Sequence, residues 1–417
     1  MRELIAYING DRAGVFRQTD GGQNEFTYDD SASTADTPMS MTMPIVPGGM
    51  YKNKVVRPFL KGLLPDNGDT LDGLARTFHT STDPFALLRH IGRDTAGALQ
   101  LLPPGGESDD AAKSTGDIMW FSDDDFEELI ADIVKDAGAW QRDRDDIRWS
   151  LAGAQPKVAL HRDDATGAWG VPRDATPTTH ILKPSGPGSR HDVNEFVTMR
   201  AAKNLGLRVA DHDVMTTSRG HHVFVSKRYD REKTPNGPGR VHQEDLAQAL
   251  GVDPANKYQS DGGPGVGEIA ALFRRLRPRA RDEARRRFFE ALVFAVASVN
   301  TDAHAKNYSM LHSGPASRLA PLYDLGSNVL YDGAQVVESA MTIGGERRMD
   351  GIGTRHFVKA ATNIGIPEDE ALQVVDRIRG GVSQAFAEAA DDAPEGDEGT
   401  ARDIADGIAR MATAKGW

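Results

Sequence analysis

Residues 300–307 contain the side-chain types that phosphoryl transfer requires. Asp302 is followed five residues later by Asn307, the separation found in the catalytic loop of protein kinases. At this spacing the aspartate can face a substrate hydroxyl while the asparagine turns back toward a metal ion. An Asx-rich turn after a helix would produce the same pair. The pair alone therefore leaves a turn and a catalytic loop open.

A second acidic position, Asp324, stands between an apolar run and Gly326. This pattern matches the metal-binding aspartate of a DFG-like segment, although a turn that ends a strand would look the same. Because Asp324 follows Asp302 and Asn307 in the order that kinases use, the three together favour a magnesium site built from Asn307 and Asp324.

Residues upstream of these motifs could hold the phosphates of ATP. The small-residue loop at 152–155 leads into an expected strand at 157–161, and its backbone N–H groups could lie along phosphates. Lys183, at the end of an expected strand, would supply the phosphate-binding cation, and Glu195 would pair with it. The alternatives are a solvated lysine and a glutamate that stabilises a helix N-terminus. With the single glycine Gly153, the loop is a weak signal by itself.

Composition excludes several classes of function. The chain has no cysteine, which excludes disulfides, thiolate metal sites and a cysteine nucleophile. A net charge of −12 makes the chain as a whole a poor DNA binder, and the basic run at 273–287 has a solvated helix face as its alternative. The longest apolar run, at 291–299, is about half of what crosses a bilayer, and no signal-peptide pattern is present. We therefore expect a soluble cytoplasmic protein.

Periodicity and turn residues predict an α+β fold in three parts. Residues 1–105 form a small β-rich subdomain, with strands at 4–8, 14–17 and 25–28 and a helix at 84–91. Residues 106–230 resemble a kinase small lobe that begins with a polar linker at 107–116 and a helix at 117–135. Its expected strands lie at 157–161, 180–183 and 222–226, around a helix at 193–204.

Residues 231–417 are expected to form a mostly helical C-terminal lobe. The clearest helical patterns lie at 243–250, 269–273, 283–299 and 368–379. An acidic stretch at 391–399 precedes a last short helix. This lobe would carry the catalytic loop and the metal site.

Taken together, these stretches resemble the HipA family of toxin kinases over nearly the whole chain. The strings that carry the resemblance are WSLAGAQPKVAL (149–160), NEFVTMRAAKNLGL (194–207), KRYDR (227–231), HQEDLAQALG (242–251), KYQSDGGPG (257–265), NTDAHAKNYS (300–309) and PLYDLGSN (321–328). The N-terminal part matches as well, in RPFLKGLLPDNG and DPFALLRHIGRDTAGALQLLP. The resemblance implies a two-lobed protein-kinase-like fold that uses ATP and Mg²⁺.

The resemblance also implies a role for individual residues. Asp302 would be the catalytic base, and Asn307 and Asp324 would bind Mg²⁺. The residues implied to contact ATP are Ala152, Gly153, Ala154, Gln155, Lys157, Lys183, His304, Lys306, Asn307, Tyr323 and Asp324.

The segment between the lobes and one serine complete these expectations. Backbone groups of Lys227 and Tyr229 would hold adenine, and Asp230 would reach the ribose. Lys227 replaces an acidic residue of a well-known member, which should alter affinity little because backbone atoms recognise adenine there. Ser150 matches the serine whose autophosphorylation switches the family's kinases off.

The resemblance further implies partners. These are a protein substrate such as an aminoacyl-tRNA synthetase, and a helix-turn-helix antitoxin through which operator DNA is contacted. Two alternatives stay open: a small-molecule kinase of the aminoglycoside phosphotransferase type, and a non-catalytic co-repressor with a DNA-binding partner. Retention of Lys183, Asp302, Asn307 and Asp324 together argues against the co-repressor.

Overall fold

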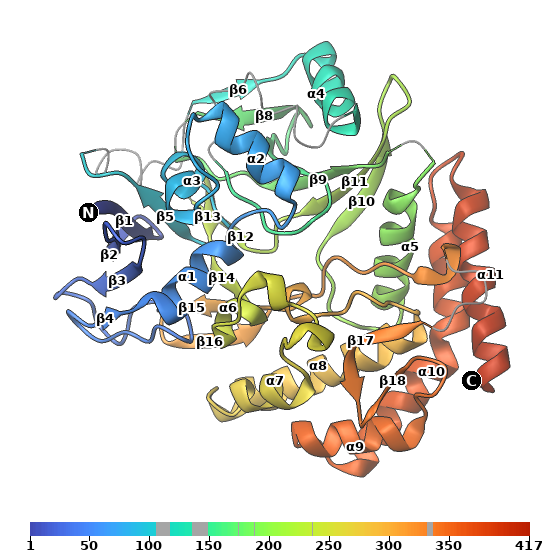
Figure 1. Ribbon diagram of the computed structural model, residues 1–417. Helices are drawn as coiled ribbons and strands as arrows, with labels where there is room; N and C mark the ends of the chain where they lie inside the picture. Colours follow the sequence, from blue (N-terminus) through green and yellow to red (C-terminus); the bar gives the residue numbers. More distant parts are fainter. Residues whose placement is uncertain (106–116, 136–148, 174, 187, 236, 332–336) are drawn as a thin grey trace. The chain divides into compact units, whose positions relative to one another are not determined.

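The computed structural model describes residues 1–105, 117–135, 149–173, 175–186, 188–235, 237–331 and 337–417 (Figure 1). The linker predicted at 107–116 lies outside these residues. The chain divides into two compact units. The first unit comprises Met1–Gly186, Thr216–Ala255 and Met310–Ser317, and the second comprises Pro187–Met215, Asn256–Ser309 and Arg318–Trp417.

The first unit begins with a five-stranded sheet in the order β4-β3-β2-β1-β5. Its strands are β1 (Arg2–Ile8), β2 (Asp11–Gln18), β3 (Asn24–Tyr28), β4 (Met50–Tyr51) and β5 (Leu99–Leu102). Asn9 and Gly10 both have positive φ, as a two-residue hairpin turn requires. The helices between β4 and β5 are α1 (Asn53–Gly62), α2 (Gly68–Thr77) and α3 (Pro84–Ile91). The predicted β-rich N-terminal part is confirmed.

A second sheet of the first unit contains strands in the order β11-β9-β7-β8-β6. They are β6 (Ile118–Trp120), β7 (Val158–Arg162), β8 (Trp169–Pro172), β9 (His180–Pro184) and β11 (His222–Lys227). The helix predicted from residue 117 is wrong in its first turn, because residues 118–120 pair with β8. Helix α4 (Asp123–Lys135) begins only after Ser122, whose hydroxyl accepts the N–H of Asp125 as an N-cap.

Shorter elements complete the first unit. They are β12 (Arg231–Thr234), β13 (Gly237–Arg240), β14 (His242–Asp245), α6 (Leu246–Leu250), η1 (Pro254–Asn256), β15 (Ser309–Ser313) and β16 (Ala316–Leu319). Strands β14, β15 and β16 form a sheet in that order. The helix predicted at 243–250 therefore begins too early. Asp245 starts it in a reciprocal capping box with Gln248, after a strand that pairs with residues distant in sequence.

The second unit is mainly helical. Its elements are α5 (His191–Asn204), β10 (His212–Thr216), which leads into the first unit, η2 (Gln259–Asp261), α7 (Val266–Phe273), α8 (Pro278–Ala297), η3 (Ala305–Asn307), η4 (Asn328–Leu330), β17 (Glu338–Ile343), β18 (Glu346–Arg348), α9 (Thr354–Ile364), α10 (Glu368–Asp391) and α11 (Glu398–Lys415). Helix α10 packs against α5, α8, α9 and α11 (Figure 1). The predicted helical C-terminal part is confirmed.

Two predicted helix ends in this unit are wrong. Helix α10 continues past Arg379 through two glycines, because Val382 and Phe386 bury apolar surface on the next turns and this outweighs the low helix propensity of glycine. A Cβ on Gly381 would come within 2.9 Å of Leu205, so the small residue allows α10 to pack closely there. Helix α11 spans 18 residues rather than a short segment. No helix within the described ranges is long and apolar enough to cross a membrane.

Candidate active site

The catalytic-loop motif folds into a turn that its own side chains hold. The chain leaves α8 through Val299, which has a positive φ of 54°. The Asn300 side chain then accepts the N–H of Asp302 at 2.9 Å. Asn307 donates its Nδ2 to the carbonyl of Asp302 at 2.7 Å. The five-residue spacing therefore closes the turn, while the Asp302 carboxylate projects outward with 55% of its side chain exposed.

His304 lies beside this carboxylate. Its side chain is only 3% exposed, and its Nε2 is 3.6 Å from Oδ1 of Asp302. Burial lowers the pKa of His304, against the opposing effect of Asp302 and with some help from Lys257. A neutral imidazole is therefore expected at neutral pH, where it can pack and accept or donate a hydrogen bond without adding charge.

Tyr323 joins the second motif to the catalytic loop. Its hydroxyl donates to the carbonyl of Lys306 at 2.8 Å and lies 2.7 Å from the hydroxyl of Ser309. Next to it, Asp324 has a positive φ of 56°, a conformation that costs a non-glycine residue about 1 kcal/mol or more. The surrounding bonds must hold it in place. The structure thus brings together Asp302, His304, Lys306, Asn307 and Tyr323, with Asp324 adjoining Tyr323 in the chain.

Contacts on either side of Asp324 explain how the strained position is held. On the N-terminal side, the backbone of Leu322 bonds to Arg208 and Ala210 at 2.8 Å each. On the C-terminal side, the amide of Asn194 bonds both the carbonyl and the N–H of Ser327, at 2.7 and 2.8 Å. The aspartate is therefore presented on a fixed turn.

Asn307 and Asp324 fit a magnesium ion by their chemistry. The ion prefers carboxylate and amide oxygens. Because the Nδ2 of Asn307 is committed to the carbonyl of Asp302, the Oδ1 of the same amide is the atom that remains for a cation. The orientation of this amide thus agrees with the predicted role.

The predicted phosphate loop lies in the first unit and is shaped by Gly153. This residue has φ +106°, and a Cβ on it would come within 2.4 Å of the Nζ of Lys157. The Lys157 ammonium donates to the carbonyl of Ala152 at 2.8 Å, which folds the loop back on itself. The neighbouring residues Ala154 and Gln155 belong to the same loop. The single glycine is therefore required by the backbone.

The N-terminal subdomain holds this loop in place. Asp66 donates its N–H to the carbonyl of Gly153 at 3.1 Å. The Ser150 hydroxyl donates to the carbonyl of Leu63 at 2.5 Å, and the Ser150 N–H donates to the carbonyl of Asp94 at 3.0 Å. Ser150 is only 1% exposed, so its phosphorylation would require the segment to move. The sequence held no motif for these contacts, because they join backbone atoms, and one serine hydroxyl, to residues far away in the chain.

Lys183 is buried rather than solvated. It lies on β9 opposite Phe224 of β11, and its ammonium is 5.5 Å from the centre of the Phe224 ring. A lysine seldom gives up its hydration without a role or a partner. This burial argues against the solvated alternative. Glu195, its predicted partner, is a buried residue of α5 in the second unit.

The segment predicted to hold adenine follows β11. Lys227 ends that strand opposite His180, and the hydroxyl of Tyr229 donates to the side chain of Gln243. Asp230 is 2% exposed. Its carboxylate accepts from Arg228 at 2.8 and 3.0 Å and from the Gly97 N–H at 2.6 Å. A ribose contact by Asp230 would therefore have to displace an existing ion pair.

Asp94 centres a buried ionic network that sequence reasoning missed. Its carboxylate lies 3.3 Å from Arg228, 2.8 Å from Arg231 and 2.9 Å from Arg240, and it accepts both polar hydrogens of Thr178. Burial alone would raise the pKa of Asp94, but the three guanidinium groups hold it well below its usual range. We refer to Asp94, Arg228, Asp230, Arg231 and Arg240 as the Asp94 network.

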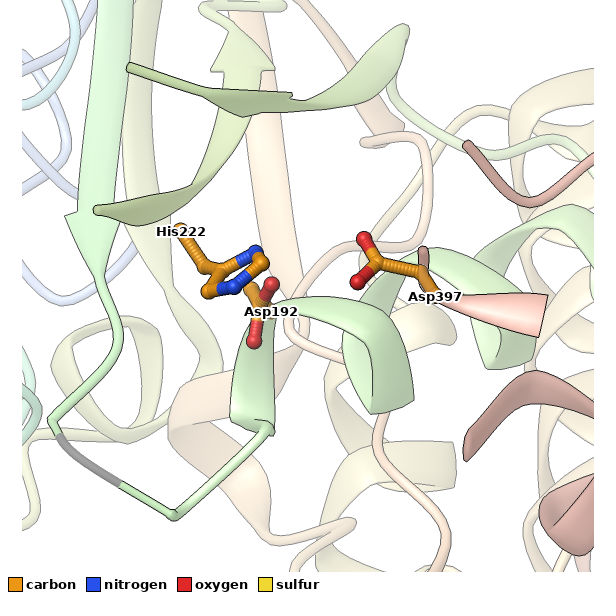
Figure 2. A group of neighbouring side chains, drawn as sticks. All are labelled: Asp192, His222 and Asp397. Atoms are coloured by element: carbon orange, nitrogen blue, oxygen red, sulfur yellow. The ribbon is translucent and has the colours of Figure 1, made fainter. Parts of the chain in front are cut away.

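A pair of buried aspartates lies in the second unit. Asp192 at the start of α5 and Asp397 before α11 are both buried, and Figure 2 shows the side chains of these two aspartates. Arg190 bonds to Asp397 and has its Nε 3.7 Å from Asp192. The arginine offsets one of the two negative charges, and we assign this cluster to joining α5 with the start of α11.

Comparisons with known proteins agree with these motifs. A family model described as HipA-like C-terminal domain matches residues 149–386, and one described as HipA N-terminal domain matches residues 4–102. The Sinorhizobium fredii protein described as "Putative kinase Y4mE" is 34% identical over 376 residues, which cover 88% of this chain and 87% of that protein. The serine/threonine-protein kinase toxin HipA of Shewanella oneidensis is 31% identical over 368 residues, 84% of this chain and 80% of the toxin.

A solved structure agrees as well. The chain aligns with one from the complex of Shewanella oneidensis HipA, HipB and operator DNA, with a TM-score of 0.83 and 26% identity. The alignment covers 98% of this chain and 96% of the other. Both matched domains follow in the order expected from the sequence. The chain therefore belongs to the HipA family of kinases.

Proposed function

We propose that this chain is an ATP- and Mg²⁺-dependent serine/threonine protein kinase, and that it is the toxin of a toxin–antitoxin pair. The observation that carries the proposal is the catalytic loop. Asn307 binds the carbonyl of Asp302 while the Asp302 carboxylate stays exposed. A carboxylate presented on a fixed backbone can orient a substrate hydroxyl and accept its proton.

Each group of site residues has a part in this reaction. Asp302 takes the proton from the serine or threonine hydroxyl, whose oxygen bonds to the γ-phosphorus as the bond to ADP breaks. Mg²⁺ on Asn307 and Asp324 would neutralise phosphate charge. The loop at 152–157, Lys183, His304, Lys306 and Tyr323 would hold the triphosphate, and the backbone of Lys227 and Tyr229 would hold adenine. Asp230 secures that segment through Arg228, with any ribose contact secondary.

We further propose that Ser150 is autophosphorylated and that this switches the kinase off. The Ser150 hydroxyl donates to Leu63 from a buried position, and a phosphorylated serine can no longer donate that bond. The modification also adds about −1.5 to −2 charge at neutral pH. The loop must then leave the segment at 63–66, so the amides that would hold ATP phosphates are lost. Intact-mass spectrometry after incubation with Mg²⁺ and ATP should show one added phosphate that is absent from Ser150→Ala.

Membership of the family supports proposals for the partner and the substrate. A solved relative is described in complex with HipB and operator DNA, and we propose a helix-turn-helix antitoxin for this chain too. The net charge of −12 supports DNA contact mainly through that partner. An aminoacyl-tRNA synthetase is the proposed type of substrate, and the cytoplasm is the proposed location.

A transfer assay with radiolabelled ATP tests the proposal. We expect label on a protein substrate only when Mg²⁺ is present, and none on aminoglycosides. Asp324→Asn should weaken Mg²⁺-dependent ATP binding by about tenfold or more, because one metal ligand loses its charge. Transfer to aminoglycosides but not to protein, or transfer that persists in excess chelator, would overturn the assignment. In cells, expression alone should arrest growth, and a cognate antitoxin should relieve the arrest.

A further inference from the structure

The string KYQSDGGPG at residues 257–265 has no part in the function proposed so far. It belongs to the second unit, as the catalytic loop does. Tyr258 stands immediately before η2, and its carbonyl accepts the N–H of Asp261 at 3.0 Å and that of Gly263 at 2.9 Å. The backbone at Tyr258 is therefore held by a tight turn within the string.

Glycines in the string make this turn possible. A Cβ on Gly263 would come within 2.2 Å of the carbonyl oxygen of Asn256 and 2.7 Å of that of Tyr258, so only glycine fits there. A Cβ on Gly265 would meet the side-chain amide of Gln259 at 2.6 Å. That amide accepts the N–H of Thr342 on β17 at 2.7 Å. The loop is thus anchored at both ends of η2, and the position of Tyr258 is well defined.

The side chain of Tyr258 is directed at the catalytic loop. Its hydroxyl donates a hydrogen bond to Oδ1 of Asp302, and its ring meets His304 edge to face, with centroids 4.8 Å apart and planes at 76°. His304 also approaches Oδ1 of the carboxylate. Both contacts fall on the same oxygen, which leaves Oδ2 to face a substrate hydroxyl.

We propose that Tyr258 is a positioning residue for Asp302. The inference rests on the proposed role of Asp302 as the base. An aspartate with more than half of its side chain exposed can rotate about two bonds, and a base must be held close to its productive geometry. The Tyr258 hydroxyl selects one orientation of the carboxylate, and the anchored turn at 258–263 keeps that hydroxyl in place.

Tyr258→Phe tests the proposal, because it removes the hydroxyl and keeps the ring against His304. We expect kcat for protein phosphorylation to fall about tenfold, in line with the loss of a hydrogen bond to a charged group. KM for ATP should stay within about twofold, since the variant keeps the ring that contacts His304, a residue assigned to ATP. Tyr51→Phe is the matched control. It removes a tyrosine hydroxyl that donates to Pro44 in the N-terminal subdomain, and it should leave kcat unchanged.

A double-mutant cycle separates positioning from a general structural effect. In an Asp302→Asn background, Tyr258→Phe should change the residual rate by less than about twofold, because residues that act through one another are not additive. A tenfold loss in both backgrounds would show an effect independent of Asp302 and would overturn the inference. So would unchanged or increased kcat in Tyr258→Phe, the latter because the hydroxyl would then be blocking the base.

The same series distinguishes this inference from the proposed function. Inactive Asp302→Asn beside fully active Tyr258→Phe overturns the role of Tyr258 alone. Fully active Asp302→Asn overturns the proposed base, and the role of Tyr258 with it.

Discussion

Asp94 and Asp302 are two aspartates that lie in opposite environments. Asp94 is buried in the first unit, where three arginines and Thr178 pair with its carboxylate. Asp302 projects from a loop of the second unit, with one hydrogen bond from Tyr258 and a buried histidine nearby. The Asp94 carboxylate is paired within the protein, whereas the Asp302 carboxylate is exposed and can meet a substrate.

This difference indicates that Asp94 serves the stability of the fold and that Asp302 serves the reaction. A buried ion that has lost its water depends on every partner, so removal of one charge leaves the others uncompensated. An exposed carboxylate contributes little to folding, and its loss is felt only by the reaction that uses it. The two regions should therefore respond to the same kind of substitution in different assays.

The largest expected effect on stability is at Asp94. Asp94→Asn removes the charge that balances Arg228, Arg231 and Arg240, and we expect the free energy of unfolding to fall by about 3–5 kcal/mol. Urea unfolding followed by circular dichroism would measure it. Asp350→Asn is the control, because Asp350 pairs with Arg348 on the surface, and its midpoint should match wild type. An Asp94→Asn midpoint equal to wild type would contradict a structural role for the network.

Acid should weaken the first unit before the carboxylates of the network titrate. Burial, helped by His312, lowers the pKa of His242 to about 4. The folded state therefore favours the neutral His242 ring. The contribution of this ring to the free energy of unfolding is complete above the ordinary pKa of about 6.5 and is lost as the pH falls toward 4. At about 1.4 kcal/mol for each pKa unit, His242 accounts for roughly 3 kcal/mol over that range.

Urea unfolding at a series of pH values checks the histidine effect. His242→Gln should make the pH dependence between 6.5 and 4 shallower, because glutamine has no proton to gain, while His180, whose pKa burial also lowers to about 4, still contributes. The depressed pKa of Asp94 places its own contribution at lower pH, where the network would be lost as the carboxylate is protonated. Wild-type stability that stays constant from pH 7 to 4 would contradict the buried neutral histidine.

A smaller effect is expected at the phosphate loop. Gly153→Ala places a Cβ on a residue with φ +106° and against the ammonium of Lys157. Backbone strain of this kind costs about 1–3 kcal/mol, so we expect ATP affinity to fall about five- to tenfold. Calorimetric titration with ATP would measure it. Gly399→Ala, at a helical position with no atom near the added Cβ, is the matched control, and equal affinities for the two variants would contradict the role of Gly153.

The residues of the catalytic loop could be predicted because their order is local. Asp302 and Asn307 are joined by a hydrogen bond within one turn, so their spacing carried the information. The Asp94 network could not be predicted in this way. Asp94 and Arg240 are 146 residues apart. From the sequence alone each is expected to be a solvent-exposed charge, and only the fold shows that they form an ion pair.

The errors in secondary structure have the same cause. Residues 118–120 and Gln243 lie in patterns that suit a helix, but each pairs with a strand from elsewhere in the chain. Pairing between distant strands overrides local propensity. Tyr258 shows an intermediate case. Its string was recognised from the sequence, but only the structure directs its hydroxyl to Asp302.

The most direct test of Asp302 as the catalytic base is Asp302→Asn, measured for phosphoryl transfer, ATP binding and unfolding on one preparation. We expect phosphoryl transfer from radiolabelled ATP to fall by about 10²-fold or more. ATP affinity by calorimetry should stay within about twofold, and the urea midpoint should equal wild type, because the carboxylate is exposed and serves only the reaction. An Asp302→Asn protein that transfers phosphate at the wild-type rate would contradict the assignment of the chemistry to this loop.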